Sequence, residues 1–468
     1  MSHRFIVRFL LSFVILLLAG LFSACDFASP TNKTTLPEQT STTTTTEQTS
    51  SITETLIMPK MYINTNNVPI NSKEEYTNCS VTILSNNPEH TLNQVQAGIR
   101  LRGHSTSNFD KVPYRIRFED KTQPLGLGSG PSRSWVLLAE YMDISMLRNY
   151  VSYNLSNTLM RNSFSSTVDY VEVYLNNIYK GVYLLAEQTQ VGENRVNIDE
   201  SGVETPTIVD TGYLLELETD STRRLAEGAH MVDWFDVPGY TNMTVDFGWW
   251  NMADYPLSNE VGFYIIKSDA KTLEQIQFIQ NYMVSVYDAI YVDKTFEAVN
   301  AVVDIPSAVD TYLMQLLTND MDYNYSSNYV YKDAGGLLIF GPPWDHDLCF
   351  GNHYQNTTTD SLHIYHLLYE LSTYEWFQTL VLARWDEINQ VSNNLIADTR
   401  TLITTTSSNY QASFNQDYNL WQSTRRTDGW HAIYLQYSSQ SAATTALLDW
   451  YDNRINFINT MFESWEDN

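Results

Sequence analysis

The stretch at residues 319–351 constrains the fold most, because it places acidic side chains at both ends of one expected β-hairpin. Residues 328–332 (NYVYK) and 337–340 (LLIF) read as its strands, and the intervening DAGG is a glycine-containing turn of hairpin type. Asp322 precedes the first strand, and Asp345 and Asp347 follow the second. In an antiparallel pair these two ends are neighbours. The pattern therefore predicts that distant carboxylates meet at one end of the hairpin.

The residues expected to converge there are Asp322, Asn328, Asp345 and Asp347. Their oxygen ligands suit Mg²⁺ or Mn²⁺. Their order also matches a protein-kinase site, in which one Asp accepts the hydroxyl proton of the substrate, an Asn holds metal, and a second Asp after a hairpin holds Mg²⁺. The spacing departs from that pattern, since Asn328 follows Asp322 by six positions and Trp-Asp-His-Asp replaces Asp-Phe-Gly. An atypical kinase site is the resulting prediction.

Each of these side chains also has a plainer interpretation. Asp345 can serve only as a turn residue, and Asp347 can orient a backbone turn. Asp322 can cap a helix end while its neighbour Asp320 acts as the base, and Asn328 can merely begin a strand. These alternatives remain open at the level of sequence.

Further motifs spread along the chain give it a family resemblance. They are IRLRGHST at 99–106, KVPY at 111–114, WVLL at 135–138, LRN at 147–149, VEVYLNN at 171–177, GVYLLAE at 181–187, YLLEL at 213–217 and the block at 319–351. With these motifs the chain resembles the CotH (spore coat protein H) kinase family over nearly everything after its leader. The resemblance implies a secreted or surface-associated atypical kinase that phosphorylates Ser or Thr of proteins with ATP and a divalent metal.

Such a kinase needs positive groups to bind the phosphates of ATP. Lys111, which follows a turn rich in small polar residues, is expected to bind the phosphates and so to take part in catalysis. Arg102 is a weaker candidate for phosphate binding. For Arg148, a nucleotide contact and a structural salt bridge remain equally open. Glu187 ends an apolar strand and is expected either to pair with Lys111, to contact the nucleotide or to form another salt bridge.

The formal net charge of −27 argues against nucleic acid and anionic membrane surfaces as partners, because both require lysine and arginine to neutralise phosphate. An acidic enzyme attracts cationic partners, so a Lys/Arg-rich protein is the expected substrate. Ordinary solubility explains the same charge equally well. Beyond Cys25 only Cys79 and Cys349 remain, and two unpaired cysteines are favoured over one bridge between them.

The N-terminus has the features of an export signal. Residues 1–24 carry Arg4, Arg8 and an apolar run at 9–21, and the Phe-Ser-Ala that precedes Cys25 resembles a bacterial lipobox. We expect lipidation of Cys25, with simple signal cleavage as the alternative. Residues 26–55 are rich in Thr and Ser and form the expected disordered tether. The predicted location is extracytoplasmic, with membrane contact through the N-terminal lipid only.

Residues 56–468 are expected to form one kinase-like domain of the α+β class, with a strand-rich lobe at about 58–270 and a helical lobe at about 271–468. Within it we expect a helix that starts near Asp143 as N-cap and another over 305–316 capped by Asp304. The helical tail is expected to break at the Ser/Thr-rich residues 404–408.

Two other functions compete with the kinase. One is a non-catalytic surface adhesion or glycan-binding lipoprotein, which the loss of Asp322 or Asp345 would have favoured; both residues are present. The other is a metal-dependent hydrolase or glycosidase, since paired carboxylates also serve those enzymes.

Overall fold

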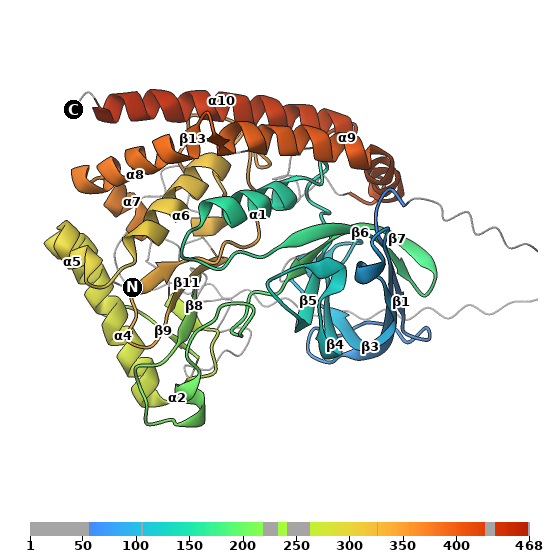
Figure 1. The fold of residues 1–468 in the computed structure, drawn as a ribbon, viewed down its shortest axis with the longest axis horizontal. Helices are drawn as coiled ribbons and strands as arrows, with labels where there is room; N and C mark the ends of the chain where they lie inside the picture. The colour runs from blue at the N-terminus through green and yellow to red at the C-terminus, as the bar shows by residue number, and fades with distance from the viewer. Residues whose placement is uncertain are drawn as a thin grey trace, which may run out of the picture. The chain divides into compact units, whose positions relative to one another are not determined.

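The computed structural model describes residues 56–103, 106–218, 233–240, 263–324, 326–354, 356–364, 366–425 and 436–466. The expected signal peptide, Cys25 and the tether at 26–55 lie outside these residues. The described chain is α+β, with a strand-rich N-terminal half followed by helices (Figure 1). Among the described residues, no helix is long and apolar enough to cross a membrane.

In the described chain, seven strands of the N-terminal half close into a barrel in the order β1-β2-β3-β4-β5-β7-β6. They are β1 (Lys60–Asn64), β2 (Thr77–Leu84), β3 (Leu92–Leu101), β4 (Tyr114–Thr122), β5 (Ser132–Leu138), β6 (Val168–Leu175) and β7 (Ile178–Glu187). Neighbouring strands are antiparallel, except that β1 and β6 run parallel, with Lys60 opposite Glu172. The first strand therefore closes the barrel against a strand more than a hundred residues later.

Side chains alternate along the strands, so that apolar ones point into the barrel and polar ones point out of it. On β4 the buried residues are Tyr114, Ile116 and Phe118, whereas Arg115 and Arg117 between them point outward. The inward side chains join those of the other strands in one apolar core that includes Trp135. Strands β6 and β7 pair as an antiparallel hairpin, and its turn, Asn176-Asn177, has positive φ at both residues.

A second sheet has the order β12-β11-β8-β10-β9. Its strands are β8 (Tyr213–Glu218), β9 (Trp234–Phe235), β10 (Phe263–Ile266), β11 (Asn328–Lys332) and β12 (Leu338–Phe340). The hairpin expected from the sequence is confirmed, since β11 and β12 pair antiparallel with Val330 opposite Phe340. The sheet carries the acid-bearing segment that follows β12.

Helices supply most of the remaining described chain, and two short strands, β13 (Asn389–Gln390) and β14 (Asn393–Asn394), form a small hairpin. The helices are α1 (Arg148–Leu159), α2 (Ser201–Glu204), α4 (Leu273–Asp288), α5 (Phe296–Asn300), α6 (Ile305–Thr318), α7 (His366–Ser372), α8 (Glu375–Ile388), α9 (Leu395–Trp421) and α10 (Gln440–Glu466). The expected cap of α6 is confirmed, because the Asp304 side chain accepts from the Ser307 N–H.

Two expectations about helices are wrong in detail. The expected break at 404–408 is absent, because α9 continues through these residues to Trp421. The first helix begins at Arg148 rather than near Asp143, although the Asp143 carboxylate still accepts from the backbone N–H groups of Ser145, Leu147 and Arg148. The side chain of Asp143 therefore organises the turn that leads into α1.

The long helix α9 connects the helical half to the barrel. It packs along α10 and α1 and reaches β7 near its C-terminal end (Figure 1). Residues Thr55–Asn468 form one compact unit by their contacts. Cys79 and Cys349 are both buried and unpaired, as the sequence favoured. The two-lobed kinase arrangement itself stays a prediction.

Candidate active site

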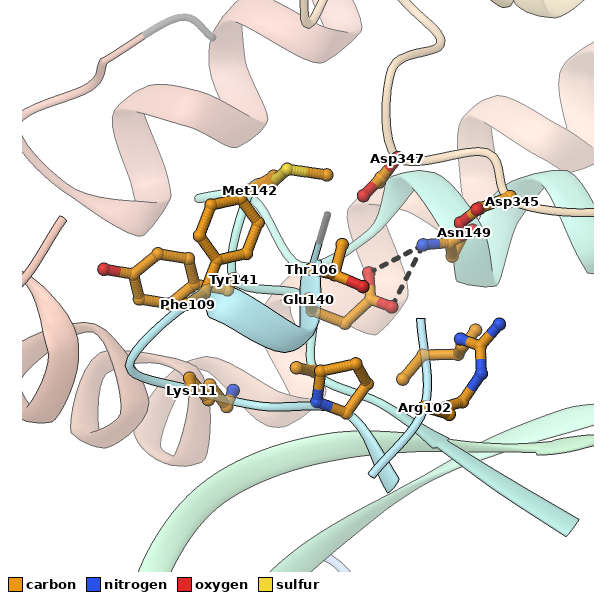
Figure 2. A pocket seen from close by; sticks show the side chains of 13 residues that line it. Arg102, Thr106, Phe109, Lys111, Glu140, Tyr141, Met142, Asn149, Asp345 and Asp347 are labelled. Carbon is orange, nitrogen blue, oxygen red and sulfur yellow. Dashed lines mark hydrogen bonds between the residues drawn. The ribbon is translucent and has the colours of Figure 1, made fainter. Parts of the chain in front are cut away.

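A pocket lies where the β3–β4 loop, the end of β5 and the segment after β12 meet (Figure 2). It encloses about 350 Å³, open solvent at its mouth included. The lining residues are Arg102, Thr106, Phe109, Lys111, Pro113, Leu138, Ala139, Glu140, Tyr141, Met142, Asn149, Asp345 and Asp347. Four residues expected at a functional site, Arg102, Lys111, Asp345 and Asp347, are therefore brought together.

The Lys111 side chain is fully buried, and its ammonium group is held by two oxygens. It donates to Asp417 Oδ1 at 2.6 Å and to the backbone carbonyl of Val182 at 2.6 Å. Burial lowers the pKa of Lys111, and the charge and hydrogen bond of Asp417 act against that lowering. The ammonium nitrogen also lies 4.9 Å from the centroid of the Tyr183 ring, which adds a cation–π contact to the two hydrogen bonds.

The pair expected between Lys111 and Glu187 is not formed. Glu187 instead makes a buried ion pair with Arg195 and accepts from both the backbone and the hydroxyl of Thr167. Glu187 does not line the pocket. The plain salt bridge that the sequence left open is the arrangement found, and Asp417 takes the place expected for Glu187.

The Lys111–Asp417 pair depends on a glycine. Asp417 Oδ1 also accepts from the Val182 N–H at 2.9 Å, so the carboxylate sits directly against the β7 backbone. A Cβ atom at Gly181 would lie 2.2 Å from that oxygen, and Gly181 has a φ of 102°, which side chains rarely adopt. The glycine of the GVYLLAE motif therefore lets a helix carboxylate approach the barrel wall.

Glu140 is an acidic pocket residue that the sequence analysis missed. It follows β5 with a φ of 52°, and its carboxylate accepts from the Asn149 amide at 3.1 and 3.4 Å (Figure 2). Burial, followed by the charge of Asp143, raises the pKa of Glu140 to about 8. A signal was present in the sequence, since Glu140 comes two residues after the apolar run at 135–138 and three residues before Asp143.

The segment after β12 presents Asp345 and Asp347. Asp345 has a φ of 64°, and the next residue, His346, donates its N–H to Asn149 Oδ1 at 2.8 Å. Burial raises the pKa of Asp347 far above its usual value, and the nearby charges of Asp345, Asp322 and Glu140 add to it. Burial also raises the pKa of Asp345, against the charge of Arg102. Of these two carboxyl groups, that of Asp347 is buried and that of Asp345 half-buried.

Of the two cationic residues that line the pocket, Lys111 and Arg102, it is Arg102 that forms fewer contacts with described side chains. Its guanidinium lies over the Trp344 ring, 5.4 Å from the centroid, and it forms no ion pair within 4 Å with any described carboxylate. Stacking fixes the plane of the group while its N–H donors stay available. Arg102 can therefore bind an anion in the pocket.

Arg148 has a different role. Its guanidinium pairs with Asp143 and donates to the backbone carbonyls of Cys349 at 3.0 Å and Phe350 at 3.3 Å. The side chain is buried and does not line the pocket. The structural salt bridge left open by the sequence is thus the one found: Arg148 fastens the start of α1 to the segment that carries Asp347.

Asp322 and Asn328 lie outside the pocket lining. Asp322 begins a short 3₁₀ turn, is half-buried, and is close enough for its charge to raise the pKa of Asp347. The competing residue, Asp320, is buried with Oδ2 2.8 Å from His346 Nδ1. Asn328 begins β11 opposite Leu217 and lies near Tyr323. Convergence of the four residues is thus borne out only in part.

The donor set fits a magnesium-like metal that is shared with phosphate. Among the described residues, no group of three or more His, Cys, Asp or Glu side chains could hold a metal alone. Mg²⁺, however, is usually bound by one or two carboxylates together with substrate phosphates. Asp345 and Asp347, which both line the pocket, supply that pair of carboxylates.

The chain was also compared with known proteins. The family model described as CotH kinase protein matches residues 99–458, which include every lining residue of the pocket. The search of curated proteins returned no match.

Proposed function

Because the chain belongs to the CotH kinase family, we propose that it is a protein kinase that transfers the γ-phosphoryl group of ATP to Ser or Thr hydroxyls. The proposal includes an extracytoplasmic location and a lipid anchor on Cys25. Family membership alone supports a kinase-like protein. The acceptor, the nucleotide and the anchor belong to the proposal.

The observation that carries the proposal is the composition of the pocket. Cations from the barrel, Lys111 and Arg102, face carboxylates from the segment after β12, Asp345 and Asp347. Phosphoryl transfer requires this combination, because positive groups bind the phosphates and acids hold the metal that neutralises them. An adhesion module would have no need to bury several acids around a small polar pocket, since such burial destabilises the fold.

Each residue has a proposed role in the reaction. Lys111 and Arg102 bind the ATP phosphates, and Asp345 and Asp347 would hold Mg²⁺ or Mn²⁺, which supplies charge neutralisation to the phosphates when bound. Asp322 accepts the proton of the substrate hydroxyl, because it is less buried than Asp320, whose Oδ2 lies 2.8 Å from His346 Nδ1.

Asp417 is proposed as the acid of the kinase lysine–acid pair. In protein kinases a Lys on a strand pairs with a Glu on a helix, and the pair must form for activity. Here Lys111 comes from the loop before β4 and Asp417 from α9. Asp417 touches no reacting atom, so its role is to position Lys111.

The remaining proposals concern partners. The net charge of −27 supports a Lys/Arg-rich protein as the substrate and argues against nucleic acid. Contact with the membrane would pass through the lipid on Cys25 only. The alternative is a non-catalytic adhesion or glycan-binding lipoprotein, which a negative result in the next experiment would favour.

The test is thermal unfolding of the purified protein with ATP, Mg²⁺ and Mn²⁺, each alone and in combination. A ligand at a hundred times its Kd adds about 2.7 kcal/mol to the free energy of unfolding, so a shift is measurable. We expect a rise in Tm that requires nucleotide and metal together. No shift with any combination would reject the proposed site.

A matched pair of variants locates the effect. Asp345→Asn should abolish the ligand-dependent rise in Tm and the phosphorylation of a basic protein such as histone, while the Tm without ligand stays close to that of the wild type. The control is Asp269→Asn, which changes an exposed acid outside the pocket and should alter neither measurement. Full phosphoryl transfer by the Asp345 variant would show that the metal assignment is wrong.

A further inference from the structure

A second pocket on the outside of the barrel gathers positive charge in an otherwise acidic protein. It encloses about 710 Å³, open solvent included, between β4, β5 and the loop after β7. Its lining residues are Arg115, Arg117, Lys121, Pro131, Ser132, Arg133, Ser134, Gln190, Gly192, Glu193, Asn194 and Arg195. Five of the 27 lysines and arginines of the chain lie here with one acid, and none of the twelve residues lines the first pocket.

The strand register forces the arginines together. Arg115 and Arg117 are consecutive outward residues of β4, and Arg115 lies directly opposite Arg100 of β3. Like charges directly opposite one another destabilise a strand pair. The charges of Arg100 and Arg117, together with burial as the largest cause, lower the pKa of Arg115. An anion bound among these groups would remove the repulsion.

Several guanidinium nitrogens in this pocket are buried without a hydrogen-bond partner in the described chain. They are Nε of Arg115 and both Nε and Nη2 of Arg195. Arg195 is only 5% exposed, and burying unsatisfied donors of a charged group is costly. Arg115 Nη2 meanwhile donates to Ser134 Oγ at 3.3 Å and to Gln190 Oε1 at 3.4 Å, so an acceptor would reach the unmet donors once these side chains shift.

Arg195 is held in a fixed position with these donors free. Its Nη1 pairs with Glu187 and donates to the Asn194 carbonyl, and its guanidinium lies over the Trp135 ring, 4.7 Å from the centroid. One edge of the group is therefore bound by the protein, while the remaining donors are not. A preorganised guanidinium loses little entropy when it binds an anion.

The exposed rim of the second pocket carries two more positive side chains, Arg117 and Arg133. Arg117 and Arg133 are exposed and form no ion pair within 4 Å with any carboxylate in the described part of the chain. The Lys121–Glu193 contact is 3.8 Å long between side chains that are 61% and 80% exposed, so it contributes little. The rim arginines can therefore turn toward a ligand at small cost.

We propose that this second pocket binds a phosphate group. Guanidinium forks match the oxygens of phosphate in bidentate fashion, and the hydroxyls of Ser132 and Ser134 lie among them. A long polyanion is disfavoured, because beyond the pocket the net charge of −27 repels it, whereas a compact dianion stays within one screening length of about 8 Å. The proposal does not depend on the proposed kinase activity.

The phosphate can be free inorganic phosphate or a phosphorylated side chain of a protein. The test is titration calorimetry of the purified full-length protein, without nucleotide, against three probes: inorganic phosphate, a phosphoserine peptide and the same peptide unphosphorylated. We expect saturable binding of phosphate, of the phosphopeptide or of both, and none of the unphosphorylated peptide. Tighter binding of the phosphopeptide would identify the protein-borne source, and equal binding the free ion.

Variants locate the binding. Arg117→Ala and Arg133→Ala remove exposed rim side chains, so the fold should persist, and each should weaken phosphate binding about tenfold. Lys271→Ala, which removes a positive charge just before α4, is the control and should change nothing. Phosphate affinity unchanged in both rim variants, or binding of none of the three probes, would overturn the proposal.

Discussion

At the level of single residues, the buried positive charge of Lys111 is neutralised by the carboxylate of Asp417. Both side chains are fully buried, and the pair lies 2.6 Å apart. Removal of one member leaves the other as an uncompensated buried charge, which typically costs about 3 to 5 kcal/mol. The pair therefore contributes to stability as well as to the proposed chemistry.

We expect Asp417→Asn and Lys111→Met each to lower the free energy of unfolding by about 3 to 5 kcal/mol, and the double variant to lose less than the sum, because no charge then remains unpaired. Urea unfolding of the four proteins measures this coupling. The positioning role has its own readout, since Asp417→Glu should restore stability in part but not the KM for ATP. Additive losses would show that the two side chains do not interact.

Glu140 predicts a pH dependence of stability in metal-free protein. Its pKa is about 8 in the folded chain against 4.5 for an unperturbed glutamate, so between these values the folded state binds more protons than the unfolded state. Its contribution to stability is therefore complete below pH 4.5 and is lost as pH rises toward 8.

Glu140→Gln removes this titration, so the loss of Tm between pH 5 and 8 should be shallower in the variant than in the wild type. Thermal unfolding in chelator at several pH values measures the two slopes. Glu463→Gln is the control, because Glu463 is an exposed residue of α10 that does not line the pocket. Parallel slopes for wild type and Glu140→Gln would contradict the assignment.

The sequence indicated which residues line the candidate pocket better than it indicated the residues they pair with. Asp345, Asp347, Lys111 and Arg102 were all placed in one pocket. The partner of Lys111 was missed, because Asp417 lies 306 residues away on a helix whose sequence gives no local sign of it. Local patterns reveal side-chain chemistry, but contacts between distant elements depend on packing.

At the scale of elements, α9 explains why the expected break at 404–408 is wrong. The hydroxyls of Thr401, Thr404 and Thr405 donate to backbone carbonyls one turn earlier, so they are satisfied within the helix. Ser407 lies against Thr444 of α10. By contrast, the β11–β12 hairpin and the Asp304 cap depend on short-range signals, and both were predicted correctly.

The start of α1 gives an element-scale prediction. Arg148 joins Asp143 to the carbonyls of Cys349 and Phe350. Arg148→Met should therefore cost about 3 to 5 kcal/mol of stability, because it leaves buried acceptors and a buried carboxylate unmet. It should also raise the KM for metal. Arg400→Met, which breaks the exposed pair with Asp452, is the comparison and should cost under about 1 kcal/mol. Equal losses of stability in Arg148→Met and Arg400→Met would show that Arg148 does not couple α1 to the site.

At the scale of the whole molecule, the net charge of −27 creates self-repulsion that salt should relieve. Raising ionic strength from about 10 to about 150 mM shortens the screening length from about 30 to about 8 Å. We therefore expect Tm to rise with NaCl at pH 7 and the rise to vanish near pH 4.5, the isoelectric point. A Tm that falls with salt at pH 7 would show that attractive ion pairs dominate instead.

The pairing of β1 with β6, and of Asp417 with Lys111, also affects the order in which the molecule can fold. Contacts between residues far apart in sequence form slowly, because a long loop must close before they stabilise anything. During synthesis the N-terminal part emerges first. Lys111 therefore has no Asp417 to pair with until α9 has been made, so the proposed lysine–acid pair cannot form in a shorter growing chain.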